Sequence, residues 1–262
     1  MKKKDTNTDL RNIQDDERRN IIAGRNPVIE ALRNKREMER IIIADGSEGS
    51  ISKIAAMAKE QGIQIQYREK SVLDRISGVN SHQGVIAVAS AYEYSELSDI
   101  FDLASERGEP PFVMILDDIE DPHNLGAIMR TCECAGAHGV IIPKRRAAGL
   151  TETVVKASAG AVEYVPCVRV SNIAQTVDRL KDMGLWIAAC DMGGEMYYRQ
   201  DLTGALGIVI GSEGKGISRL VKQKCDFTVS MPVQGKINSL NASNAAAVIM
   251  YEVRKQRDAQ QI

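Results

Sequence analysis

Apolar runs bounded by turn residues divide most of the chain into alternating strand-like and helix-like segments. In the second half such runs stand at residues 112–116, 139–142, 163–168, 185–189, 206–210 and 227–231. Helical patterns separate them, and strands that alternate with helices indicate a largely parallel sheet covered on both faces. A final helix over about 242–256 has an apolar stripe that includes Ile249 and Val253. These patterns predict an α/β fold.

Residues 21–91 predict a second, smaller α/β unit. A short helix opens at Asn26-Pro27, where the missing N–H of proline costs nothing. Strands are expected at 40–44, 64–67 and 85–88, with helices at 51–61 and from 71 onward. Glycine and proline cluster at 108–111, which is typical of a domain boundary. We therefore expect a flexible tail at 1–20, a small domain at 21–91, a linker with a short helix at 92–111, a main domain at 112–257 and a tail at 258–262.

Composition and charge narrow the function classes. The 262 residues carry a net charge of −1, so any nucleic-acid binding must use local patches. Five cysteines, an odd number, fit a reducing cytosol, and Cys132-x-Cys134 lacks the second ligand pair of a zinc site, so no metal is expected. No apolar segment follows Lys2-Lys3-Lys4, and no stretch is long enough for a membrane span. We expect a cytoplasmic protein.

The first candidate for chemistry is the helix that should follow strand 112–116. Asp121 is a good N-cap and Pro122 a good first residue, so Asn124 lies in the first turn. Arg130 stands about two turns further on. Gly126 is unfavourable in a helix interior, which indicates that its missing side chain leaves room for something. A capped helix with a solvated arginine is the alternative.

Two small-residue loops, 211–216 and 238–244, each follow a predicted strand. Loops at strand ends offer backbone N–H and C=O groups to ligands. The first loop matches neither the Walker A nor the G-x-G-x-x-G pattern, which disfavours a phosphate-cradling nucleotide fold. Glu213 is a plausible partner for the guanidinium of Arg130. Ser239, Asn241 and Ser243 exceed what capping of the final helix needs, so a ligand role is favoured. The alternative for the 211–216 loop is a tight strand-to-helix turn with an exposed glutamate.

At three blocks the chain resembles the SpoU/TrmH branch of the SPOUT RNA methyltransferases. The blocks are 124–130, 210–216, and Met231-Pro232-Val233 with 239–243, and the resemblance spans about 112–256. Residues 21–91 resemble the small substrate-binding domain that accompanies the RlmB-like members acting on 23S rRNA. This resemblance implies a C-terminal SPOUT domain with a trefoil knot, a small N-terminal RNA-binding domain and a homodimer with its active site near the interface.

The resemblance also implies a reaction and its residues. The family transfers a methyl group from S-adenosylmethionine to a ribose 2'-OH. The cofactor would be held mainly by main-chain groups at Gly211, Met231 and Leu240, with Ile210, Ala189 and Asp191 nearby. Arg130 would be the activating residue, and Asn124, Glu213, Ser239 and Asn241 would position the ribose and the loops. Because arginine is a poor base, Arg130 is either transiently neutral or an orienting cation, and we favour the second.

RNA contacts would come from basic patches. These are Lys144, Arg145 and Arg146 after a strand, Lys236, and also Arg219, Lys222 and Lys224. A solvated face is the alternative for each. The two-domain layout favours a guanosine of 23S rRNA as substrate. A tRNA guanosine, a non-catalytic RNA-binding or ribosome-assembly role, and an enzyme acting on a small metabolite remain alternatives.

Overall fold

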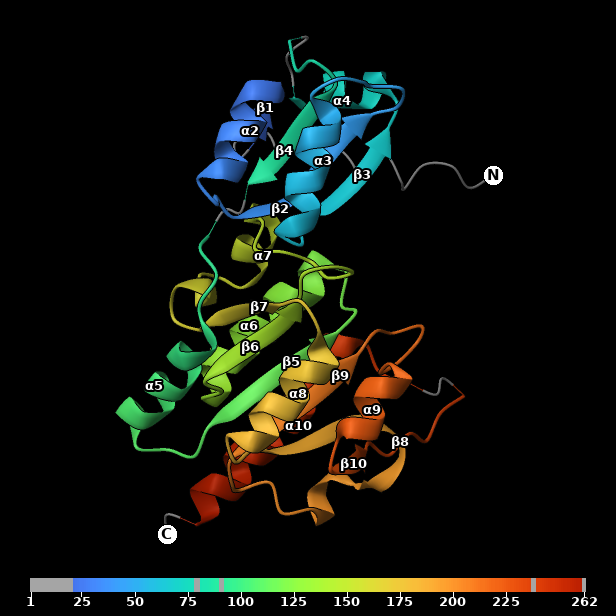
Figure 1. Ribbon diagram of the computed structural model, residues 1–262. Coiled ribbons are helices and arrows are strands. Elements are labelled where there is room, and N and C mark those ends of the chain that lie inside the picture. The colour runs from blue at the N-terminus through green and yellow to red at the C-terminus, as the bar shows by residue number, and fades with distance from the viewer. Residues whose placement is uncertain (1–20, 78–80, 90–91, 237–238, 261–262) are drawn as a thin grey trace. The chain divides into compact units, whose positions relative to one another are not determined.

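The computed structural model describes residues 21–77, 81–89, 92–236 and 239–260. The tail expected at 1–20, and Asn238 of the second small-residue loop, lie outside the described residues. The chain forms two compact units (Figure 1). The first holds the residues up to Glu93 together with Gly149–Thr153, and the second holds Tyr94–Ala148 and the residues from Val154 onward.

The first unit contains a four-stranded mixed sheet in the order β1-β4-β2-β3. Strand β4 (Val85–Ala89) is antiparallel to β1 (Ile21–Ala23) and to β2 (Met38–Ala44), whereas β2 is parallel to β3 (Gln64–Arg68). Helices α2 (Arg25–Arg33), α3 (Ile51–Glu60) and α4 (Lys70–Ser77) complete it. The predicted helices and strands are confirmed, while the three-residue β1 was too short to show a pattern.

The second unit is built on six parallel strands in the order β10-β8-β9-β5-β6-β7. They are β5 (Phe112–Asp117), β6 (Gly139–Pro143), β7 (Cys167–Val170), β8 (Trp186–Met196), β9 (Leu206–Gly211) and β10 (Phe227–Ser230). The helices are α5 (Leu97–Arg107), α6 (Pro122–Ala135), α7 (Glu152–Ala157, which begins in the first unit), α8 (Ile173–Asp182), α9 (Arg219–Lys224) and α10 (Ala242–Ala259). In Figure 1, α8 and α9 lie in front of this sheet, and α6 and α10 lie behind it. The predicted parallel sheet flanked by helices is confirmed.

Three segments of the second unit differ from expectation. The strand expected at 163–168 begins only at Cys167, because Pro166 has no N–H for the ladder and a 3-10 turn (Ala161–Glu163) precedes it. Helix α10 continues to Ala259, beyond the predicted start of the tail. Helix α5 lies in the segment expected to be a linker, yet its Ile100 is fully buried in the core of this unit.

The sheet places the segments that follow β5 and β9 at the same edge. Asp117 at the end of β5 is opposite Gly211 at the end of β9, so the segments that follow these strands start side by side. Asp121 caps α6, as predicted, by accepting from the N–H of His123 at 2.9 Å. A Cβ on Gly126 would lie 2.5 Å from the Cβ of Ala157 and 2.9 Å from the carbonyl oxygen of Val154. The space predicted beside Gly126 is thus filled by the Ala157 side chain and the backbone of α7.

Candidate active site

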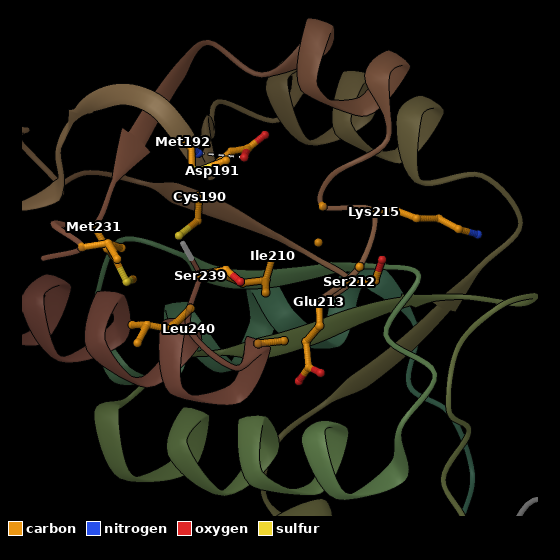
Figure 2. Close-up of a pocket in the computed structure, with 16 residues that line it drawn as sticks. Cys190, Asp191, Met192, Ile210, Ser212, Glu213, Lys215, Met231, Ser239 and Leu240 are labelled. Carbon is orange, nitrogen blue, oxygen red and sulfur yellow. Dashed lines mark hydrogen bonds between the residues drawn. The ribbon is translucent and has the colours of Figure 1, made fainter. Parts of the chain in front are cut away.

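A pocket of about 340 Å³ opens where β9 and β10 end, beside the middle of β8. Figure 2 shows Cys190, Asp191 and Met192 on one side and Ser212, Glu213 and Lys215 on another. The remaining lining comes from the ends of β9 and β10 and the start of α10. The full set is Cys190, Asp191, Met192, Ile210, Gly211, Ser212, Glu213, Gly214, Lys215, Gly216, Met231, Val233, Ser239, Leu240, Ala242 and Ala245. We call it the strand-end pocket, and its volume suits a small organic ligand.

The 211–216 loop forms one wall and is tightly closed. The N–H of Gly216 donates to the carbonyl of Ser212 at 2.8 Å. A Cβ at position 211 would lie 2.1 Å from the carbonyl carbon of Gly216 and 2.3 Å from the nitrogen of Ile217. Only glycine fits at 211, so the main chain of Gly211 itself lines the pocket.

A bulge in β8 forms the opposite wall. Thr228 of β10 is opposite Ala189, but the next residue, Val229, is opposite Glu195. Residues 190–194 therefore have no strand partner on β10, although Cys190 still pairs with Ile210 of β9, and we call them the 190–194 bulge. The Ser230 hydroxyl joins the two sides of the bulge: it donates to the carbonyl of Asp191 and accepts from the N–H of Gly194, both at 2.7 Å.

A cluster of polar side chains stands beside the pocket. The Nδ2 of Asn124 donates to Oε1 of Glu213 at 3.1 Å, and the Nδ2 of Asn241 donates to the same oxygen. The Nδ2 of Asn241 also donates to Oδ1 of Asn124 at 3.0 Å. The Oδ1 of Asn241 meanwhile caps α10 by accepting from the N–H groups of Ser243 and Asn244. Three residues from three predicted blocks thus meet in one amide–carboxylate cluster.

Arg130 does not join this cluster. The expected pairing of Arg130 with Glu213 was wrong: Glu213 takes the amides of Asn124 and Asn241, and Arg130 is exposed with no ion pair to any described residue. Helix geometry explains the difference. Six residues separate Asn124 from Arg130, which puts them about 9 Å apart along the axis and about 120° apart around it.

Most other candidates lie at the pocket. Gly211, Ile210, Met231, Leu240, Asp191 and Ser239 line it. Ala189 does not, because its side chain is fully buried in the core. Cys190 and Met192 also line the pocket, and they belong to the strand end 189–192 that the resemblance implied as a weaker cofactor contact, whereas Lys215 was not singled out within its loop. Burial, with the nearby charge of Asp191, raises the pKa of the Cys190 thiol to about 11, so this thiol is protonated at neutral pH.

The basic candidates fall into two groups. Arg145, Arg146 and Lys236 are exposed, while Lys144 is half-buried. Lys222 and Lys224 are instead engaged in ion pairs with Asp191 and Asp178. Arg145, Lys236 and Arg219 at the start of α9 are exposed and form no ion pair with a described residue, whereas Arg146 lies 3.9 Å from the carboxylate of Asp118.

The described residues contain neither a metal-binding group nor a membrane-spanning helix. No group of three or more His, Cys, Asp or Glu side chains there is arranged to hold a metal ion. No helix in that part of the chain has the length and apolarity needed to cross a bilayer.

Two families match the chain, one on each side of the predicted boundary. Residues 111–251 match the SpoU rRNA Methylase family. This chain belongs to that family. Residues 21–95 match the RNA 2'-O ribose methyltransferase substrate binding family, so the SpoU methylase domain is accompanied by a substrate-binding domain.

Relatives agree over nearly the whole length. A Bacillus subtilis protein named as the TrmH family tRNA/rRNA methyltransferase YacO is 48% identical over 239 residues, covering 90% of this chain and 96% of its own. A Staphylococcus aureus (strain MSSA476) protein named as a TrmH family tRNA/rRNA methyltransferase is 46% identical over 245 residues, covering 92% and 98%. This SpoU family member is thus a TrmH-type RNA methyltransferase.

Solved structures share the fold. The SpoU methyltransferase AviRb from Streptomyces viridochromogenes, in complex with AdoMet, has a TM-score of 0.58 at 24% identity, covering 91% of this chain and 90% of its own. An AdoMet-bound rRNA methyltransferase from Sinorhizobium meliloti has a TM-score of 0.58 at 22% identity, covering 97% of each chain. At these identities the likeness establishes the architecture of the SpoU domain.

Proposed function

We propose that this protein methylates the ribose 2'-OH of a guanosine in 23S rRNA, with S-adenosylmethionine as the methyl donor. The observation that carries the proposal is the strand-end pocket of a SpoU family domain, with the cluster of Glu213, Asn124 and Asn241 at its edge. The substrate-binding domain supports a large folded RNA as the substrate.

The strand-end pocket suits this donor. S-adenosylmethionine is amphipathic, and the pocket combines the backbone of a closed glycine loop with the apolar side chains of Ile210, Met231 and Leu240. AviRb and the Sinorhizobium meliloti enzyme were both solved with AdoMet. We assign the main chain at Gly211, Met231 and Leu240 to donor binding. Ala189 can take part only through its backbone, because its side chain is buried.

The other candidate residues are assigned to positioning the ribose and to binding RNA phosphates. When bound, the donor supplies a methyl group on a cationic sulfur. Arg130, exposed and without an ion pair to a described residue, stays cationic and orients an RNA phosphate next to the reacting ribose. The amide–carboxylate cluster and Ser239 hold the ribose so that its 2'-oxygen faces the pocket. Arg145, Arg146, Lys144 and Lys236 contact further phosphates.

The resemblance further implies a homodimer. We propose that α10 contributes to the interface, because its Val248 and Tyr251 are exposed apolar side chains. Light scattering of the purified protein measures the predicted dimer directly. The trefoil knot stays a prediction.

Methyl transfer to RNA tests the function. Purified protein with radiolabelled S-adenosylmethionine should label unmodified 23S rRNA and leave unmodified tRNA unlabelled. Mapping of 2'-O-methyl groups in rRNA from a strain without the protein should show one guanosine unmethylated. Labelling of tRNA alone would establish the tRNA alternative, and labelling of neither RNA would favour a non-catalytic role.

A further inference from the structure

Helix α9 connects the two walls of the strand-end pocket. It begins directly after the 211–216 loop, where the N–H of Ser218 donates to the buried carboxylate of Asp117 at 2.7 Å. One turn later, Nζ of Lys222 lies 2.6 Å from Oδ2 of Asp191 in the 190–194 bulge. The helix that starts at one wall is thus tied by an ion pair to the other.

Asp191 is held from several directions. Its Oδ1 accepts from the N–H of Met192 at 2.7 Å, its Oδ2 faces Lys222, and its carbonyl accepts from the hydroxyl of Ser230. Lys222 and Asp191 expose 37% and 25% of their side chains, so the pair is only partly screened by water. Lys222 therefore fixes the position of a carboxylate that lines the pocket.

The ion pair also sets the local charge. The charged side chains of the pocket lining are Asp191, Glu213 and Lys215. Glu213 is bound by neutral amides, whereas Asp191 is neutralised by Lys222. The charge of Asp191 acts on the pocket wall, since it contributes to the raised pKa of the Cys190 thiol. Changing either partner of the pair would change the potential inside the pocket.

The proposed reaction changes the charge of the pocket's ligand. The methyl group moves from sulfur to the ribose oxygen, the carbon–sulfur bond electrons stay on sulfur, and the hydroxyl proton is released. The donor has a cationic sulfur, and the product, S-adenosylhomocysteine, has a neutral one. A pocket with more negative charge therefore binds the donor better relative to the product.

We propose that Lys222 is a positioning residue of the strand-end pocket that, through Asp191, sets the pocket's preference between the cationic methyl donor and its neutral product. This inference rests on the proposed function, since it takes the pocket to bind S-adenosylmethionine. It assigns to Lys222 a role in ligand discrimination rather than in RNA binding.

Opposite charge changes on the two partners provide the test. Lys222→Met leaves Asp191 unneutralised, and Asp191→Asn leaves Lys222 unneutralised. Calorimetry should show that the ratio of the product Kd to the donor Kd rises about threefold to tenfold in Lys222→Met and falls in Asp191→Asn. A purely structural role would weaken both ligands together and leave the ratio unchanged in both variants. That result would overturn the inference.

Helix α9 offers a matched control. Lys224 is also on α9 and also forms an ion pair, with Asp178 of α8, but neither residue lines the pocket. Lys224→Met should keep the wild-type ratio, and so should Lys222→Arg, which preserves the charge. A ratio that moves equally in Lys224→Met would contradict the specific role of Lys222.

The two proposals fail differently. If the wild-type protein binds neither ligand, the proposed function is wrong. If the wild type binds both and the ratio does not respond to Lys222→Met, only the inference about Lys222 is wrong. Should Lys222→Met not fold, as judged by its circular dichroism spectrum, Asp191→Asn alone carries the test, because its predicted shift is opposite in sign.

Discussion

At the scale of single residues, Glu213 and Arg130 have different proposed roles, one in positioning and the other in contacting RNA. The carboxylate of Glu213 accepts from two asparagine amides, so its orientation is fixed by neutral partners. Arg130 is left without a partner in the described part of the chain. A guanidinium in this state keeps all its donors for an external acceptor such as phosphate.

Arg130→Ala should abolish methyl transfer and leave binding of S-adenosylmethionine intact. We expect at least about a hundredfold loss of rate, because correct orientation of the reacting groups is worth several kcal/mol. Single-turnover methyl transfer and calorimetry measure the two properties separately. Arg179→Ala, at an exposed arginine of α8, is the control for general loss of charge. Near-normal turnover of Arg130→Ala would remove this residue from the site.

Asn241 has two roles that substitution can separate. Asn241→Ser retains an oxygen to cap α10 but lacks the amide that reaches Glu213 and Asn124. We expect it to keep most of the stability and lose most of the activity. Asn241→Ala should also lose about 1 kcal/mol of unfolding free energy, the usual value of a cap. Urea unfolding and methyl-transfer rates measure these effects, and equal activity loss with no stability difference would contradict the capping role.

At the scale of elements, the conformation of the 211–216 loop depends on close contact between its two ends. Gly211→Ala should displace the 211–216 loop, because its Cβ would overlap the backbone of Gly216 and Ile217. Gly214 is the matched control in the same loop, since a Cβ there meets nothing within 4 Å. We expect donor affinity to fall more than tenfold in Gly211→Ala, the cost of over 1.4 kcal/mol of displaced contacts, and to stay near wild type in Gly214→Ala. Calorimetry compares them, and equal affinities would show that the loop tolerates the side chain.

A buried histidine directly before β6 links stability to pH. The Nδ1 of His138 accepts from the N–H of Phe112 at 3.0 Å, and its Nε2 lies 3.4 Å from the Glu109 carboxylate. Burial lowers the pKa of His138 from its ordinary 6.5 to about 4, although Glu109 opposes the shift. The unfolded chain therefore binds a proton that the folded protein rejects, and stability is lost as the pH falls from about 6.5 toward 4.

His138→Asn should reduce this loss. Asparagine has an oxygen that can accept from Phe112 but does not titrate. Between pH 7 and 4.5 the wild type should lose about 1 to 3 kcal/mol more unfolding free energy than the variant, since each unit of pKa shift corresponds to about 1.4 kcal/mol. Urea unfolding at both pH values gives the difference. Parallel losses in the two proteins would show that His138 does not contribute.

At the scale of the whole molecule, RNA binding must work against a net charge of −1. The chain's 34 lysines and arginines are balanced by 35 acidic residues, so phosphate contacts must come from local groups such as Arg145 and Arg146 after β6, of which Arg146 also lies 3.9 Å from the Asp118 carboxylate. The double variant Arg145→Ala/Arg146→Ala should reduce the slope of log affinity against log salt by about 1 to 2. Lys181→Ala, at a lysine paired with Asp226, is the control and should leave the slope unchanged. Filter binding at several salt concentrations measures both, and identical slopes would move the RNA surface elsewhere.

The sequence predicted the molecule well where local patterns decide the structure. The buried runs at β5 and β9 and the cap at Asp121 were visible as patterns. The 190–194 bulge was not, because it depends on the register between β8 and β10. For the same reason the chain itself gave no sign that Lys222 meets Asp191, 31 residues away, or that Glu213 prefers the amides to Arg130.

Asn241 both caps α10 and contacts Asn124, which determines when the cluster can form during synthesis. Its contact with Asn124 spans 117 residues, and the same side chain starts the last helix. The cluster is therefore incomplete while the ribosome is still making the chain up to Asn241. At that stage the residues of β5, α6 and the 211–216 loop have been made, but the side chain that joins Asn124 to α10 has not. The proposed active site therefore forms only after the start of α10 has been made, so a chain that ends before Asn241 should have no methyl-transfer activity.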